Sequence, residues 1–167
     1  MLRILNKIRK TGIVTEPVTE DRSLEALGIE LKRLVDARMR GSFAIREVDA
    51  GSCNACELEV HALNNPYYDI ERFGVHFVAS PRHADALLVT GPVSRHMAAA
   101  LKRTYDAVPA PKWVIAMGDC TIDGGEFGCN YATVGAVERI VPVDLVIPGC
   151  PPTPAVLMRA LLALLQQ

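Results

Sequence analysis

Five short apolar runs constrain the fold of this chain more than any other feature. They are mostly hydrophobic and are separated by polar or glycine-containing stretches: FAIREV (43–48), VHFVA (75–79), ALLVT (86–90), KWVIAM (112–117) and VDLVI (143–147). Such runs are typical of parallel strands covered on both faces, because those strands have no solvent-facing side. Helical stretches fit at residues 94–107 and 154–165. We therefore predict an α/β fold, a parallel sheet with helices on both faces.

The chain has 167 residues, of which 50% are hydrophobic, so it can build one domain with a sizeable core. We predict a single α/β domain over residues 23–167. Residues 1–22 precede it, and TGIVTEPVTED (11–21) within them is typical of an extended linker. In MLRILNKIRK, Leu2, Leu5 and Ile8 can share one face of a basic helix. A basic amphipathic helix can lie on an anionic membrane or against a membrane subunit, so we predict a docking segment.

Charge and hydropathy exclude several classes of protein. The formal net charge of −1 gives no basic patch for nucleic acid, so we expect no nucleic-acid partner. The apolar run near residue 160 is short and contains Arg159, which argues against a membrane span. The beginning of the sequence lacks the apolar core of a secretory signal and a twin arginine, which indicates the cytoplasm. Structural disulfides are rare there, so the five cysteines require a metal or redox explanation.

Four of the five cysteines come directly after predicted strands. Cys53 and Cys56 follow FAIREV in the stretch GSCNAC, Cys120 follows KWVIAM, and Cys150 follows VDLVI. The carboxyl ends of parallel strands meet at one edge of a sheet, where open α/β folds form their binding crevices. We therefore expect four thiols from three loops to converge at that edge.

Four thiolates suit either zinc or an iron–sulfur cluster. Zinc is usually held by two compact ligand pairs, and this sequence contains one such pair. Gly51, Gly118 and Gly149 come one or two residues before the cysteines and let backbone amides approach cluster sulfurs. The residues favour a cluster. Zinc stays open, as does thiol–disulfide chemistry at Cys53 and Cys56, although the latter leaves Cys120 and Cys150 unexplained.

Four further residues deserve separate hypotheses. Glu57 can place a carboxylate beside the metal, or it can simply face the dipole of the helix that it begins. Arg82 and His83 follow VHFVA, so we expect them at the same edge, where positive charge favours the reduced state of a metal centre. A solvated loop is the alternative for both. Cys129 lies in a glycine-containing loop outside these motifs, and we interpret it as a free thiol.

Several motifs together resemble a known family. GSCNACELEVHAL, SPRHADALLVTGPVSRHM, MGDCTIDGG and VPVDLVIPGCPPTP are similar to the small cluster-bearing subunit shared by respiratory complex I and NiFe-hydrogenases, over about residues 41–165. The resemblance implies a flavodoxin-like fold. It also implies one 4Fe–4S cluster bound by Cys53, Cys56, Cys120 and Cys150. That cluster would pass electrons to or from an active site in a large partner subunit.

The first cysteine motif indicates a branch of this family. Complex I subunits carry two adjacent cysteines there, whereas this sequence has C-N-A-C, as in hydrogenases. Uptake hydrogenases add a twin-arginine signal and a C-terminal extension with more clusters, which are missing from this sequence. The chain is most similar to energy-converting, membrane-associated hydrogenases of the formate hydrogenlyase type.

This resemblance implies an electron-transfer subunit that is not catalytic alone. Its implied partners are a large NiFe subunit and other iron–sulfur and membrane subunits, with the complex peripheral on the cytoplasmic side of the membrane. Two alternatives remain. One is a complex I-type subunit that serves quinone reduction, and the other is a zinc-stabilised scaffold.

Overall fold

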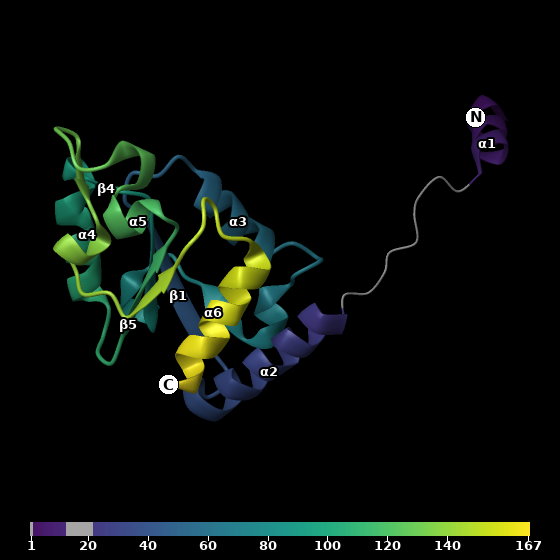
Figure 1. Cartoon of the computed structure of the whole chain (residues 1–167). Coiled ribbons are helices and arrows are strands. Elements are labelled where there is room, and N and C mark those ends of the chain that lie inside the picture. Colours follow the sequence, from purple (N-terminus) through teal and green to yellow (C-terminus); the bar gives the residue numbers. More distant parts are fainter. Residues whose placement is uncertain (1, 13–21) are drawn as a thin grey trace.

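The computed structural model describes residues 2–12 and 22–167 (Figure 1). Most of the predicted linker, residues 13–21, therefore lies outside the described residues. The α-helices are α1 (Leu2–Thr11), α2 (Arg22–Met39), α3 (Ala55–Leu63), α4 (Arg95–Ala107), α5 (Cys120–Asp123) and α6 (Pro154–Gln166). The 3-10 helices are η1 (Ile70–Phe73), η2 (Pro81–His83), η3 (Gly125–Phe127) and η4 (Val137–Arg139).

The predicted apolar runs form a parallel sheet. Its strands are β1 (Phe43–Asp49), β2 (Val75–Phe77), β3 (Ala86–Thr90), β5 (Trp113–Met117) and β7 (Leu145–Ile147). In the described part of the chain they lie in the order β2-β1-β3-β5-β7, and every pairing is parallel. Numbered along the sheet's own strands, this is the 2-1-3-4-5 order of flavodoxin-like folds. The α/β prediction is confirmed.

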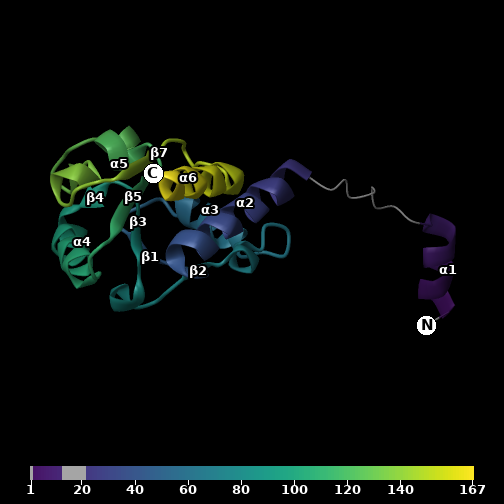
Figure 2. The same cartoon turned by 90° about the horizontal axis from the view of Figure 1, so that it is seen from below.

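Helices cover both faces of the sheet, as Figure 2 shows. Phe43 and Ile45 of β1 are buried in one core together with Leu31 of α2 and Leu161 of α6. The other core joins alternate strand residues, such as Val48, to α4. Successive side chains of a strand point to opposite faces, so a strand covered on both sides is apolar at almost every position. All five residues of β3 are buried, which explains the uninterrupted ALLVT run.

Local signals in the sequence set the ends of several helices. Gly41 follows α2 with a φ of +91°, and its N–H donates to the Val35 carbonyl at 3.2 Å. The Ser94 hydroxyl caps α4 by accepting from the Met97 N–H at 3.2 Å. Pro154 lies in the first turn of α6, where its missing N–H costs no intrahelical bond. The sequence thus marks where α2 ends and where α4 and α6 begin.

Residues 2–11 form the predicted basic amphipathic helix, α1. All of its residues are exposed, including Leu2, Leu5 and Ile8, and the adjacent Ile4 adds to its apolar side. Residues 91–135 contain a second, two-stranded antiparallel sheet of β4 (Val93–Ser94) and β6 (Thr133–Gly135), which the sequence did not predict. Among the described residues, no helix is both long enough and apolar enough to cross a membrane.

Candidate metal centre

Three loops at the carboxyl edge of the sheet carry the four predicted cysteines. Cys53 lies in the loop after β1, and Cys56 lies in the first turn of α3. Cys120 is the first residue of α5, directly after β5, and Cys150 follows β7. Cys53 and Cys150 are exposed, whereas Cys56 and Cys120 are partly buried. Successive strands are added on one side of β1 (β2) and then on its other side (β3, β5, β7), so the strand order reverses between β1 and β3. Open α/β folds bind ligands beside such a switch point.

A carboxylate at the end of β1 shapes the first loop. Asp49 Oδ1 accepts hydrogen bonds from the N–H groups of Gly51 and Ser52, both at 2.7 Å. Gly51 has a φ of +124°, and a Cβ there would lie 3.0 Å from the Ser94 Cβ. The loop between β1 and α3 therefore turns tightly past the end of the strand and passes beside Ser94, which caps α4.

The loop before Cys120 and the loop before Cys150 are joined by hydrogen bonds of their backbones and of the Asp119 side chain. The Asp119 N–H donates to the Gly149 carbonyl at 3.0 Å, and the Gly149 N–H donates back to Asp119 Oδ1 at 2.7 Å. The Gly118 N–H donates to the Ile147 carbonyl at 2.8 Å. This pairing holds the residues before Cys120 and Cys150 side by side.

Two glycines let backbone approach the sulfur atoms. Gly118 has a φ of +95°, and a Cβ at this position would lie 2.8 Å from Cys56 Sγ. A Cβ at Gly125 would likewise lie 2.8 Å from Cys120 Sγ. Distances this short do not occur between real atoms of this kind, so a larger residue would push the thiols out of place. Glycine is therefore required at Gly118 for both its backbone conformation and its neighbour.

The four thiols share one electrostatic environment. Burial raises the pKa of Cys56 to about 12, and the charges of Glu57, Cys53, Cys120 and Cys150 add to the increase in that order. Burial also raises the pKa of Cys120, as do Cys150 and Cys53. Because burial and neighbouring negative charge raise both pKa values, a bound cation would favour the deprotonated forms of Cys56 and Cys120.

The chemistry of the donors is compatible with more than one metal group. Four cysteine thiols are a donor set for an iron–sulfur cluster and for a zinc ion. In residues 2–12 and 22–167, no three His, Cys, Asp or Glu side chains lie close enough together to hold a single metal ion.

Glu57 lies beside the thiols as a buried residue and not as a surface acid at the start of a helix. Its side chain is 7% exposed, and the Thr90 hydroxyl donates to its Oε1. The same hydroxyl lies 3.4 Å from Oε1 of Glu47. Burial raises the pKa of Glu47, and the nearby carboxylates of Glu57 and Asp49 raise it further. Sequence reasoning missed Glu47, although an acid inside the apolar run FAIREV was a signal for it.

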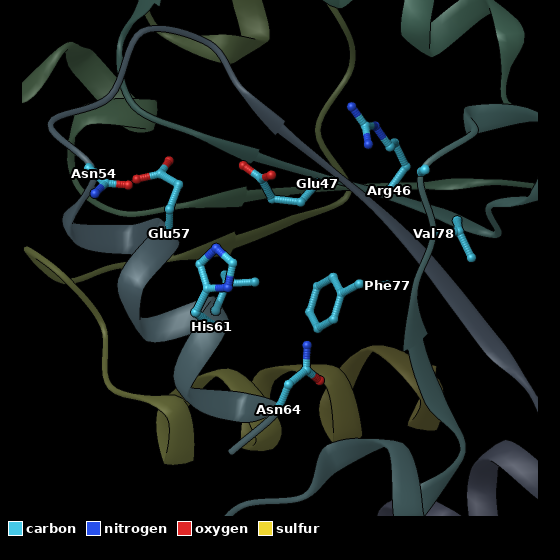
Figure 3. Close-up of a pocket in the computed structure, with 10 residues that line it drawn as sticks. Arg46, Glu47, Asn54, Glu57, His61, Asn64, Phe77 and Val78 are labelled. Carbon is cyan, nitrogen blue, oxygen red and sulfur yellow. The ribbon is translucent and has the colours of Figure 1, made fainter.

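A pocket of about 370 Å³ lies beside this buried pair of acids. Glu57 and His61 of α3, with Asn64 directly after the helix, line one side of it, and Glu47 faces them from β1 (Figure 3). Phe77, at the end of β2, forms part of its apolar wall. The pocket therefore joins the carboxyl ends of β1 and β2 to the helix that carries Cys56.

Arg82 and His83 do not join the cysteines in the structure. Both are exposed and lie in η2, in the connection that returns from β2 to the amino end of β3. Shortly after them, Asp85 Oδ2 accepts from the Ala44 N–H at 2.8 Å, at the beginning of β1. The expectation placed them at the carboxyl edge because they follow VHFVA, whereas this connection returns toward the amino end of β3. Their role beside a metal centre stays a prediction.

Cys129 also lies apart from the four cysteines. It is exposed, its Sγ is 3.7 Å from the Thr133 carbonyl oxygen, and an Arg139 nitrogen approaches it at 3.4 Å. It is not among the groups that raise the pKa of Cys56 or Cys120. Its assignment as a free thiol stays a prediction.

A flavodoxin-order sheet with cysteines at its carboxyl edge defines a class of α/β proteins that present thiol ligands beside the switch point of the sheet. Within that class, the chain belongs to the family described as NADH ubiquinone oxidoreductase, 20 Kd subunit, which matches residues 53–164. The match covers the part of the chain from the first cysteine to the last turns of α6. It confirms the resemblance seen in the cysteine motifs.

Similar curated proteins are hydrogenase subunits. The chain is 42% identical over 147 residues to formate hydrogenlyase subunit 7 of Escherichia coli, an alignment covering 88% of this chain and 56% of that protein. It is 46% identical over 120 residues to a probable membrane-bound hydrogenase subunit of Pyrococcus furiosus, covering 72% of each. The chain thus spans little more than half the length of the first of these relatives.

Solved structures with a similar fold come from redox complexes. A chain in the membrane-bound sulfane sulfur reductase, an archaeal respiratory membrane complex, is 33% identical with a TM-score of 0.68, covering 80% of this chain and 73% of that one. A chain of an NAD+-reducing [NiFe]-hydrogenase has a TM-score of 0.58 over 75% of this chain and 92% of its own. At 20% identity, the second likeness supports the fold alone.

Proposed function

We propose that this chain is an electron-transfer subunit holding one 4Fe–4S cluster through Cys53, Cys56, Cys120 and Cys150. It relays electrons to or from the NiFe active site of a large partner subunit in a membrane-associated hydrogenase complex. The observation that carries the proposal is that four cysteines follow the ends of three neighbouring parallel strands, in a chain of this family. The hydrogenase names of its relatives support the choice of complex.

Such a cluster, when bound, accepts and releases one electron at a time. The protein's own residues determine how readily it does so. The partly buried Cys56 and Cys120 keep part of the site away from water, and Gly118 and Gly125 let backbone lie against their sulfurs. Burial and nearby hydrogen-bond donors are the means by which proteins tune cluster potentials. All four thiols are used in this assignment, so the catalytic metal belongs to the partner and the chain is not catalytic alone.

The membrane association of the complex is part of the same proposal. We place the chain on the cytoplasmic side, attached through other iron–sulfur and membrane subunits and through the exposed basic helix α1. Residues 1–22 serve as docking segment and linker, and residues 23–167 as the cluster-binding domain. The relative described as membrane-bound supports the attachment.

Two neighbouring functions compete with a hydrogenase. The family takes its description from an NADH–ubiquinone oxidoreductase, and a similar solved chain comes from a sulfane sulfur reductase. In both cases this chain would still carry electrons, and only the acceptor in the large subunit would differ. The C-N-A-C spacing at Cys53 favours the hydrogenase.

The test is to tag this chain, purify its complex anaerobically, and identify the large subunit and its metals. We expect broad visible absorption from the cluster, bleaching on addition of hydrogen, and nickel in the large subunit. A colourless complex containing zinc would overturn the cluster, because zinc thiolates do not absorb visible light. A coloured complex without nickel would overturn the hydrogenase assignment and leave the electron-transfer role.

A further inference from the structure

The pocket beside the cysteines contains two buried polar atoms that have no hydrogen-bond partner within residues 2–12 and 22–167. They are Oε2 of Glu57 and Nε of Arg46. Both residues line the pocket of about 370 Å³ between α3 and the ends of β1 and β2 (Figure 3). A buried donor or acceptor without a partner destabilises the fold, and more so if it is charged. The free Glu57 oxygen requires a donor, and the Arg46 nitrogen requires an acceptor.

The charges around the pocket do not balance. Glu47 and Glu57 bring two carboxylates to its lining, whereas Arg46 brings one guanidinium. Thr90 provides a single hydroxyl between the two acids, and Asp49 adds further negative charge at the end of β1. His61, on the next turn of α3, is the other titratable group that faces them. One additional positive charge would neutralise the pair and supply the donor that Glu57 Oε2 requires.

The walls of the pocket indicate the shape of that cation. Val60, Phe77 and Val78 add apolar surface to a lining that also contains the two carboxylates. A small hydrated ion gains nothing from an apolar wall. A long side chain with an aliphatic stem and a cationic head matches both parts, because its stem packs on apolar surface while its head reaches the acids. A carbonyl of the same inserted segment can accept from Arg46.

We propose that the large partner subunit inserts a lysine or arginine side chain into this pocket, with its cationic head between Glu47 and Glu57. The inference rests on the proposed function in requiring that partner, and it adds the chemistry by which the partner is recognised. The contact fixes the partner directly beside Cys56, because Glu57 is the next residue in α3. A buried charge pair of this kind chiefly slows dissociation of a complex.

The test uses the complex purified through a tag on this chain, carrying Glu47→Gln or Glu57→Gln. We expect the dissociation constant for the large subunit to rise about tenfold or more, since removing one partner of a buried charge pair has effects of this size. Glu47→Lys would place its own cation in the pocket and exclude the partner's, so it should weaken association at least as much. The control is Glu71→Gln, which removes an exposed carboxylate from η1, outside the lining of the pocket.

Visible absorption of each variant reports whether the cluster is present, so it separates failure of the inserted-cation proposal from failure of the proposed electron-transfer function. Retained cluster absorption with weakened association supports the inserted cation, and wild-type association of both glutamine variants overturns it. Absence of any large subunit or cluster in the wild-type preparation overturns the proposed function instead. If the variants do not fold, the structure of the wild-type complex decides. A basic side chain of the large subunit in the pocket supports the proposal, and water or an uncharged residue alone overturns it.

Discussion

A group of neighbouring cysteine thiolates is stabilised only when a cation lies among them. Without one, Cys56 is a partly buried thiol whose pKa is raised to about 12, with three other thiols and the Glu57 carboxylate nearby. Binding of the proposed cluster would therefore have to displace the proton that this environment holds on Cys56. The environment disfavours free thiolates and is suited to thiolates bound to metal.

Replacing any one of Cys53, Cys56, Cys120 or Cys150 with serine should remove or severely distort the electron paramagnetic resonance signal of the reduced cluster. A hydroxyl is a poor substitute for a thiolate as an iron ligand, which is the physical reason. Cys129→Ser is the matched control and should leave the signal unchanged. Four serine variants with normal spectra would end the hypothesis, and loss of signal in Cys129→Ser would show that the wrong four were chosen.

Alkylation of the cluster-free chain should be slow at Cys56 and fast at the exposed Cys53, Cys129 and Cys150. The raised pKa keeps the Cys56 thiol protonated, and only the thiolate reacts. Below that pKa its thiolate population increases about tenfold with each pH unit, so labelling of Cys56 should accelerate steadily from pH 7 to pH 10. Mass spectrometry after timed iodoacetamide pulses measures this. A Cys56 rate independent of pH would contradict it.

At the scale of single elements, the strands were the most predictable part of the molecule. The runs FAIREV, ALLVT and KWVIAM became β1, β3 and β5 almost residue for residue, because burial on both faces leaves a direct mark on composition. The same apolar runs also predicted that the four cysteines follow strand ends, as they do in the structure. The helical stretches at residues 94–107 and 154–165 were also confirmed.

The parts that could not be predicted depend on contacts between distant segments. Glu47 and Glu57 meet through Thr90, and no local pattern connects those three positions. Arg82 and His83 were placed at the wrong edge because the length of a connection does not reveal where it crosses the sheet. Gly118 was expected to admit a backbone amide, but its contact with Cys56 Sγ required the packed structure.

Gly118→Ala should destabilise the protein by roughly 1–3 kcal/mol and reduce cluster occupancy. The new Cβ would carry the strain of a φ of +95° and would lie 2.8 Å from Cys56 Sγ. Gly41→Ala is the control, because its φ of +91° is similar but the nearest atom, Asp36 Oδ1, is 3.6 Å away. Thermal unfolding and iron content measure the two effects. Equal iron loss in both variants would mean that backbone strain alone is responsible.

Deleting Met1 to Lys10 should release activity into the soluble fraction while the cluster stays intact. The cysteines and every strand of the main sheet lie beyond Gly41, so the sheet does not require this segment. Basic residues near an anionic membrane contribute about 1 kcal/mol each, so high salt alone should detach the complex only partly. Membrane fractionation and iron content provide the readouts. A truncated chain that stays fully membrane-bound would show that α1 has no part in attachment.

At the scale of the whole molecule, the carboxyl edge is unsuited to water. Ile122, Phe127 and Tyr131 lie in the segment after Cys120 and are 46%, 52% and 93% exposed. Cys53 and Cys150 are exposed at the same edge. Large exposed apolar side chains beside exposed cysteines are typical of a surface that another subunit covers.

The chain expressed alone should therefore be poorly soluble or depleted of its cluster, and co-expression with its large subunit should restore both. The covering subunit would bury the apolar side chains and keep oxygen from the cluster. Soluble yield and iron per chain, compared with and without the partner, measure the effect. A stable monomer that keeps a full cluster in air would contradict this expectation.

The spread of the proposed ligands along the chain has a consequence for how the protein is made in the cell. Cys53 and Cys56 leave the ribosome roughly 5–20 seconds before Cys150, at synthesis rates of about 5–20 residues per second. During that interval β7, the last strand of the sheet, does not yet exist, and the first two thiols form an incomplete chelate open to competing metals and oxidants. The correct metal must arrive after translation has passed Cys150, so biogenesis depends on the timing of delivery as well as on affinity.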